Sequence, residues 1–184
     1  MNTLVIHPHD ITTTFLESVY EHVADRTVIR GGVTREELAA LVSSHDRIMM
    51  MGHGSPWGLL AVGQFPGSGT YIVEYSIAQL LKKKKNSVFI WCNADQYVKW
   101  HDLEGFFSGM FISEVREAMM IGLGRMEKSV IDDSNNAFGI ITGSFIASPS
   151  PRMICENVKR NYGSLATVNP VAAFNNERLY YRPE

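Results

Sequence analysis

The sequence predicts an α/β fold, a three-layer α/β/α sandwich with a mostly parallel sheet of about six strands. Short apolar runs such as Arg47–Met51 and Ser87–Trp91 are closed by polar or glycine-rich breaks, a pattern typical of buried parallel strands. Helical spacing alternates with such runs through the first half, which favours a parallel sheet with helices on both faces. At 184 residues, we expect a single domain over residues 1–184.

The composition indicates a soluble protein. Hydrophobic residues make up 45% of the chain and charged residues 20%, and the formal net charge of −2 gives no general attraction for nucleic acid or anionic membranes. Two cysteines, Cys92 and Cys155, do not suggest a disulfide framework. The first six residues lack a basic region, and no apolar run approaches the roughly 18 residues of a membrane span. We therefore expect a cytoplasmic protein without nucleic-acid or membrane partners.

In the first half of the chain, turn and capping residues clearly separate the apolar segments. His7-Pro8-His9-Asp10 ends the first apolar run, Gly31-Gly32 ends the second, and Thr34 with Glu37 fits a helix capping box. Apolar side chains recur at helical spacing between these breaks. The expected elements are a strand at Thr3–Ile6, a helix at Thr12–Val23, a strand at Thr27–Arg30, a helix from Thr34 to about Ser44 and a strand at Arg47–Met51.

The second half is less regular. Four lysines at 82–85 suit the C-terminal end of a helix, because its dipole favours positive charge there. Residues 135–147 fit a helix or a strand, and the caps available at 132–135 favour the helix. The expected elements are a small hairpin of 59–62 with 71–73 around a turn at 66–69, a helix at 76–85, a strand at 87–91, an irregular aromatic segment after Asp95, a helix at 113–123, an exposed polar stretch at 124–131, helices at 135–147 and 152–162, and late strands at 171–174 and 178–181.

Two strand ends supply a candidate catalytic pair. The first ends in Gly52-His53-Gly54 and the second in Cys92, and function collects at the carboxyl edge of open α/β sheets. A cysteine attacks carbonyl groups as a thiolate, so it needs a neighbouring base, and His53 can serve as that base and then protonate the leaving amine. The 39 residues between the pair allow one helical crossover between adjacent parallel strands. The backbone N–H groups of Gly54 and Cys92 are the candidate oxyanion donors.

The segments IMMMGHGS and VFIWCNAD resemble the signature of the caspase-like (clan CD) cysteine peptidases, in which one apolar strand ends in His-Gly and a later one in Cys. Clostripain, the gingipains and the CHAT-domain proteases share that signature. The resemblance covers about residues 1–147 and implies a caspase-like fold. It also implies an enzyme that hydrolyses peptide bonds through a thioester intermediate. Such an enzyme requires no cofactor, although some relatives use calcium. Ile90-Trp91 differs from the residues that caspases and clostripain place before the cysteine, so the subfamily is open.

The resemblance also implies that the loop after the first strand lines the pocket for the residue before the scissile bond. In this chain that loop contains His9 and Asp10, and an aspartate there would favour a basic residue. Asn93 and Asp95 belong to the Cys-Asn-Ala-Asp continuation, which is loosely similar to the gingipains. Trp57, in the turn after His53, could form a wall of the cleft. An equally good explanation of Asp10 is that it caps the following helix.

Two other functions stay open. A caspase-like interaction module could keep the fold without using the pair. A metal-dependent hydrolase could use the His7-x-His9-Asp10 cluster, which is faintly similar to the His-Pro-Asp-Asp motif of the LmbE-like deacetylases. The other histidines are scattered, so we expect no metal site. The expected partner is a protein or peptide substrate, and the sequence does not predict the oligomeric state.

Overall fold

The structure of the protein is a computed structural model that describes residues 1–62, 71–72 and 75–183. Its main sheet has six strands in the order β2-β1-β3-β6-β7-β8. The first five are parallel to one another, and β8 runs antiparallel to β7. These strands are β1 (Thr3–Ile6), β2 (Arg26–Ile29), β3 (Arg47–Met51), β6 (Val88–Ile90), β7 (Gly105–Ser108) and β8 (Leu179–Arg182). The mostly parallel six-stranded sheet was predicted and is confirmed.

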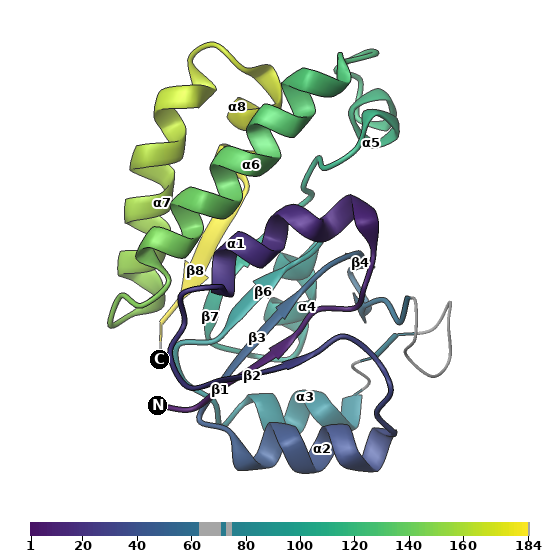
Figure 1. The fold of residues 1–184 in the computed structure, drawn as a ribbon, viewed down its shortest axis with the longest axis vertical. Coiled ribbons are helices and arrows are strands. Elements are labelled where there is room, and N and C mark those ends of the chain that lie inside the picture. Colours follow the sequence, from purple (N-terminus) through teal and green to yellow (C-terminus); the bar gives the residue numbers. More distant parts are fainter. Residues whose placement is uncertain (63–70, 73–74, 184) are drawn as a thin grey trace.

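Helices cover both faces of this sheet, which makes the three layers (Figure 1). One face carries α2 (Arg35–Ser44), α3 (Tyr75–Leu81) and α4 (Ala94–Trp100). The other carries the 3-10 helix η1 (Ile11–Leu16), α1 (Glu17–Tyr20), α6 (Lys128–Phe145) and α7 (Pro151–Ala166). Two further helices, α5 (Val115–Met120) and α8 (Pro170–Glu177), pack with α6 in a smaller cluster. A two-stranded hairpin, β4 (Gly54–Ser55) with β5 (Gly58–Leu59), follows β3.

The two hydrophobic cores follow the alternation of side chains along the strands. In β3, Ile48 and Met50 pack with α2, α3 and α4, whereas Met49 and Met51 pack with α1, α6 and α7. In β6, Phe89 belongs to the first core, and its neighbours Val88 and Ile90 belong to the second. Such strands are buried on both faces, which explains why they are continuously apolar in the sequence.

Glycines let α6 approach α1 closely. A Cβ atom built on Gly139 would lie 2.4 Å from the carbonyl oxygen of Phe15, and one on Gly143 would lie 2.2 Å from that of Ser18. Real Cβ atoms do not come so near a backbone oxygen, so only glycine fits at either position without a shift of the backbone. The two glycines lie four residues apart on one face of α6. They therefore fix how η1 and α1 sit over the sheet.

Several predicted elements need correction. The irregular aromatic segment expected after Asp95 is in fact helix α4 followed by strand β7. The tail at 171–174, expected as a strand, belongs to α8, whereas β8 confirms the strand at 178–181. The first half of the helix expected from Thr12 is the 3-10 helix η1.

Two errors concern where helices begin and end. The expected caps at 132–135 lie inside α6, which already begins at Lys128, so helix was the right choice for 135–147 and its start was wrong. The four lysines at 82–85 lie just beyond the end of α3 at Leu81. In the expected hairpin, Leu60 does pair with Tyr71 in an isolated antiparallel bridge. The turn predicted at 66–69 lies outside the described residues.

Candidate active site

His53 and Cys92 lie at the same level of two neighbouring strands. In the parallel pair β3 and β6, Met51 is in register with Ile90. His53 and Cys92 each follow that registered pair by two residues, so both come from the carboxyl edge of the sheet and lie on the side of α1 and α6. Both side chains are partly exposed and line one small pocket, together with Phe15 and residues of the 111–113 segment. The structure thus brings the predicted pair to one site.

Thr12 holds one nitrogen of the His53 ring. Its Oγ1 atom lies 2.7 Å from Nε2 of His53 and 2.6 Å from Oδ1 of Asp10. The threonine hydroxyl has a single hydrogen, which it donates to the carboxylate, so it accepts a hydrogen bond from the Nε2–H group of His53. In the neutral imidazole this leaves Nδ1 with a lone pair. The contact with Thr12 therefore sets the tautomer that can take up a proton at Nδ1.

Asp10 supports this arrangement from the N-terminus of η1. It is the N-cap of that helix and accepts hydrogen bonds from the backbone N–H (2.8 Å) and the hydroxyl of Thr12. Burial raises the pKa of Asp10, but the hydrogen bonds from Thr12 and the nearby His53 outweigh burial and hold the pKa below its usual value. The carboxylate is thus charged at neutral pH, and its Oδ1 atom lies 3.7 Å from Nε2 of His53. The structure confirms the alternative explanation given for Asp10, namely that it caps the helix that follows.

The loop that carries Asp10 is anchored by buried His7. Nδ1 of His7 lies 3.0 Å from the hydroxyl of Tyr20, and Nε2 lies 3.1 Å from that of Thr13. Burial lowers the pKa of His7 to about 4, so the ring is neutral at physiological pH. The two hydroxyls tie the end of β1 to η1 and α1, and they occupy both ring nitrogens of His7.

Cys92 makes its contacts with the segment that follows β7. Its Sγ atom lies 3.1 Å from the carbonyl oxygen of Phe111 and 3.4 Å from Oε1 of Glu117, and the single thiol hydrogen is donated to one of these acceptors or shared between them. The other oxygen of Glu117 accepts three hydrogen bonds, from the backbone N–H groups of Ser113 and Glu114 and from the hydroxyl of Ser113. Among the described residues, no hydrogen bond joins Cys92 to His53.

These surroundings keep the thiol protonated. Burial and, after it, the negative charge of Glu117 raise the pKa of Cys92 to about 12. Cys155, on α7, is fully buried, and burial raises its pKa to about 11. Neither thiol is ionised at neutral pH in this state. A reaction at Cys92 requires its hydrogen bonds to Phe111 and Glu117 to be exchanged for a contact with a base.

Close packing against Trp91 requires a glycine at position 54. A Cβ atom at this position would lie 2.1 Å from Cδ1 of Trp91, the buried residue before Cys92. The indole Nε1–H of Trp91 donates to the carbonyl oxygen of Ser55 at 3.0 Å. Trp91 therefore links the end of β6 to the hairpin after β3, which holds the backbone at His53 and Cys92 together. This role is compatible with the oxyanion role predicted for the Gly54 N–H group.

None of the other predicted substrate-binding residues lines the small pocket that contains His53 and Cys92. Asp95 is on α4 and forms an ion pair with Lys99, with 3.1 Å between Nζ and Oδ2. Asn93 adopts a left-handed backbone conformation just before α4, with φ of 66°. Trp57 is 66% exposed and packs against the ring of Trp100, with 5.1 Å between ring centroids. His9 is exposed, and its backbone N–H donates to Arg30.

No group of three or more His, Cys, Asp or Glu side chains among the described residues is arranged to bind a metal ion. In the His7-Pro8-His9-Asp10 segment, His7 is buried against Tyr20 and Thr13, and Asp10 caps η1. The donors that the metal-hydrolase alternative requires therefore do not converge. In the same part of the chain, no helix combines the length and apolar character needed to cross a membrane.

Sequence reasoning missed Thr12 and Glu117. Thr12 is 41 positions from His53 in the sequence, and Glu117 is 25 positions from Cys92. No local sequence pattern therefore predicts either contact. The nearest signal for Thr12 was the Asp10-x-Thr12 spacing at the start of a helix. Glu117 had none, because an acidic residue in the first turn of a helix is ordinary.

Comparison with known proteins assigns no family to this chain. No family model matches it, and no curated protein matches its sequence. A crystal structure from P. pentosaceus, described as a protein (NADPH-quinone reductase), has 12% sequence identity and a TM-score of 0.32, and the match covers 88% of this chain and 98% of that one. A likeness at this level does not bear on function.

Proposed function

We propose that the protein is a caspase-like cysteine peptidase that hydrolyses peptide bonds through Cys92 and His53. The observation that carries the proposal is their placement at one level of adjacent parallel strands, around a shared pocket. The proposal is further supported by the hydrogen bond that fixes the His53 tautomer through Thr12. We also propose a cytoplasmic location, which two free cysteines favour.

In the proposed reaction, Nδ1 of His53 takes the thiol proton as Sγ of Cys92 attacks the scissile carbonyl carbon. The carbon–nitrogen bond then breaks, the proton passes from Nδ1 to the leaving amine, and a thioester forms. Water hydrolyses the thioester, giving its proton to the same nitrogen and regenerating the thiol. The backbone N–H groups of Gly54 and Cys92 are the proposed donors to the oxyanion. Thr12 and charged Asp10 stabilise the imidazolium ion that appears in each step.

One observation favours a catalytically silent interaction module as the second candidate. The Cys92 thiol lies within hydrogen-bonding distance of Phe111 and Glu117, and among the described residues it forms no hydrogen bond with His53. A peptidase must leave this state when a substrate binds, whereas an interaction module need not. Covalent labelling separates the two functions, because it depends on the reactive state being reached.

Labelling with electrophilic peptide ketones that end in Arg, Asp or Asn tests the proposal. We expect one peptide to modify the native protein stoichiometrically, and mass spectrometry of the digest should place the adduct on Cys92. Cys155→Ser should be labelled at the wild-type rate, because Cys155 is buried on α7 away from the pair. Labelling of Cys92 no faster than that of a free cysteine peptide, for all three ketones, would favour the silent module.

Glu117→Gln is expected to make Cys92 more reactive. Removal of a negative charge 3.4 Å from the sulfur lowers the pKa of the thiol, so the thiolate fraction at any pH below that pKa should rise about tenfold or more. The rate of Cys92 alkylation by iodoacetamide, measured against pH, reports this change directly. Glu36→Gln, an exposed substitution on α2, is the control and should leave the profile unchanged. An unaltered profile for Glu117→Gln would show that the carboxylate does not govern the thiol.

A further inference from the structure

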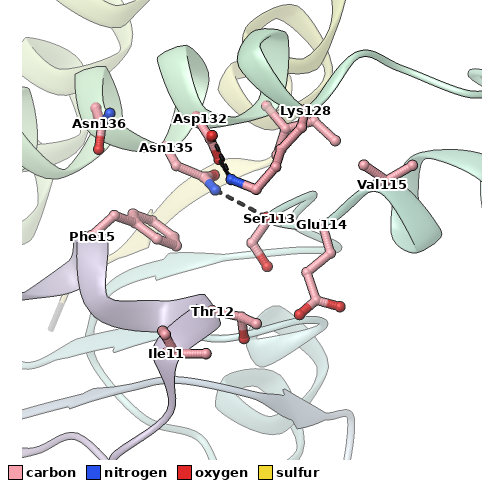
Figure 2. A pocket seen from close by; sticks show the side chains of 11 residues that line it. Ile11, Thr12, Phe15, Ser113, Glu114, Val115, Lys128, Asp132, Asn135 and Asn136 are labelled. Atoms are coloured by element: carbon pink, nitrogen blue, oxygen red, sulfur yellow. Dashed lines mark hydrogen bonds and ion pairs between the residues drawn. The ribbon is translucent and has the colours of Figure 1, made fainter.

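A larger pocket adjoins the candidate pair. It has a volume of about 590 Å³, within the roughly 300–1,000 Å³ of small-ligand sites. Its walls come from η1, from the segment before α5 and from the first turns of α6, as Figure 2 shows. Phe15 and Ser113 line both this pocket and the small pocket that contains His53 and Cys92. The two pockets are therefore adjacent, which places the larger one beside a substrate residue bound at Cys92.

The lining combines apolar walls with hydrogen-bond acceptors. Phe15, Val115 and the buried Ile131 give apolar surface for a long side chain. Its charged lining residues are two carboxylates, those of Glu114 and Asp132, and one ammonium group, that of Lys128. Lys128 is already paired with Asp132, with 2.8 Å between Nζ and Oδ1, so Glu114 supplies the negative charge that is left over. The pocket thus favours a cationic ligand over an anionic one.

Asn135 lines this pocket and ties α6 to the segment before α5. It is only 5% exposed, and its Nδ2 group donates to the carbonyl oxygen of Ser113 at 3.0 Å (Figure 2). Its Oδ1 atom has no hydrogen-bond partner among the described residues. Buried acceptors without partners are uncommon and costly, but this oxygen has almost no accessible surface, so a ligand in the pocket does not reach it.

We propose that this pocket binds the side chain of an arginine immediately before the scissile bond, and that Glu114 is the residue that selects it. The inference rests on the peptidase function proposed above. An arginine has an apolar stem for the walls and a planar guanidinium group that can form two parallel hydrogen bonds with the Glu114 carboxylate, a geometry that lysine does not match. Glu114 replaces Asp10 and Asp95 as the proposed selecting carboxylate, because Glu114 lines this pocket and the other two residues do not.

Peptides that differ only by arginine or citrulline before the scissile bond test the role of charge, since citrulline keeps the shape and loses the positive charge. For the native protein we expect kcat/KM to favour arginine by about tenfold to a hundredfold. Glu114→Gln should bring the ratio close to one. Lys128→Ala removes the cation that competes for the pocket and should raise the ratio, and exposed Glu36→Gln should not alter it. Cleavage with a ratio near one in the native protein would overturn the arginine assignment and leave the peptidase proposal intact.

A binding measurement covers the case in which no peptide is cleaved. In the Cys92→Ala protein, N-acetyl-arginine amide should shift the amide resonances of residues 113–115 and 131–136, and the citrulline analogue should bind about tenfold more weakly or worse. Glu114→Gln should abolish that difference. Glu114-dependent arginine binding without any cleavage would remove the peptidase proposal and keep the pocket assignment. Absence of binding in both measurements would remove the pocket assignment.

Discussion

Substitution of His53 by alanine is expected to lower kcat/KM for peptide cleavage by about 10²- to 10⁴-fold, the usual contribution of a general base. No other described imidazole lines the pocket that contains Cys92, so the thiol proton has no alternative acceptor of suitable basicity. The measurement is hydrolysis of the peptide found by ketone labelling, at saturating and at low substrate concentration. His22→Ala is the matched control, because His22 is exposed, does not line this pocket and lies beside its neighbour Glu21.

Cys92→Ala should abolish the same activity, and the double variant with His53→Ala should be no worse than Cys92→Ala by itself, since the two side chains act as one unit. Thermal unfolding of each variant verifies that the fold is retained. Wild-type cleavage by either single variant would remove the proposed chemistry. A loss of kcat/KM in His22→Ala as large as that in His53→Ala would show that the assay responds to general damage.

Gly139→Ala and Gly143→Ala are each expected to lower the free energy of unfolding by about 1–3 kcal/mol or more, because the added methyl group would meet a backbone carbonyl oxygen of η1 or α1 at 2.4 or 2.2 Å. For a chain of this length, each kcal/mol corresponds to about 2–4 °C in Tm. The measurement is chemical denaturation followed by circular dichroism.

Gly163→Ala is the matched helical control. Its added methyl group would meet only the Asn176 side chain, at 3.4 Å, and alanine is the better helix former by about 1 kcal/mol. This variant should therefore be neutral or slightly stabilised. A destabilisation at Gly163 equal to that at Gly139 or Gly143 would contradict the explanation by close helix packing. Because η1 carries Thr12, we expect the destabilising variants also to weaken the hold on His53.

The parts of the fold that could be predicted are those where one pattern dominates. Arg47–Met51 was predicted with the correct ends, since a continuous apolar run bounded by a charge and a glycine has one good interpretation. The Thr34 and Glu37 capping box was also correct, because both hydrogen bonds form within four residues. The meeting of His53 and Cys92 at one sheet edge followed from the same strand assignments.

Other features depended on contacts between distant parts of the chain. Helix α4 begins after Asn93, whose side chain makes no capping hydrogen bond, so the usual start signal is missing. Acidic and amide residues at 132–135 signal a cap in isolation, yet Ser134 and Asn135 are buried inside α6. Glu114 and Glu117 acquire their roles from the path of the chain after β7, which no local periodicity encodes.

The surroundings of Cys92, which is partly buried beside Phe111 and Glu117, also affect how its thiol withstands oxidants. With a pKa of about 12, roughly one sulfur in 10⁵ is ionised at pH 7, and peroxides attack the ionised form. Compared with an exposed cysteine of ordinary acidity, Cys92 should persist far longer in its reduced form in a peroxide-stressed cell. Burial and the neighbouring Glu117 carboxylate, which keep the thiol protonated, thus also protect it from oxidation.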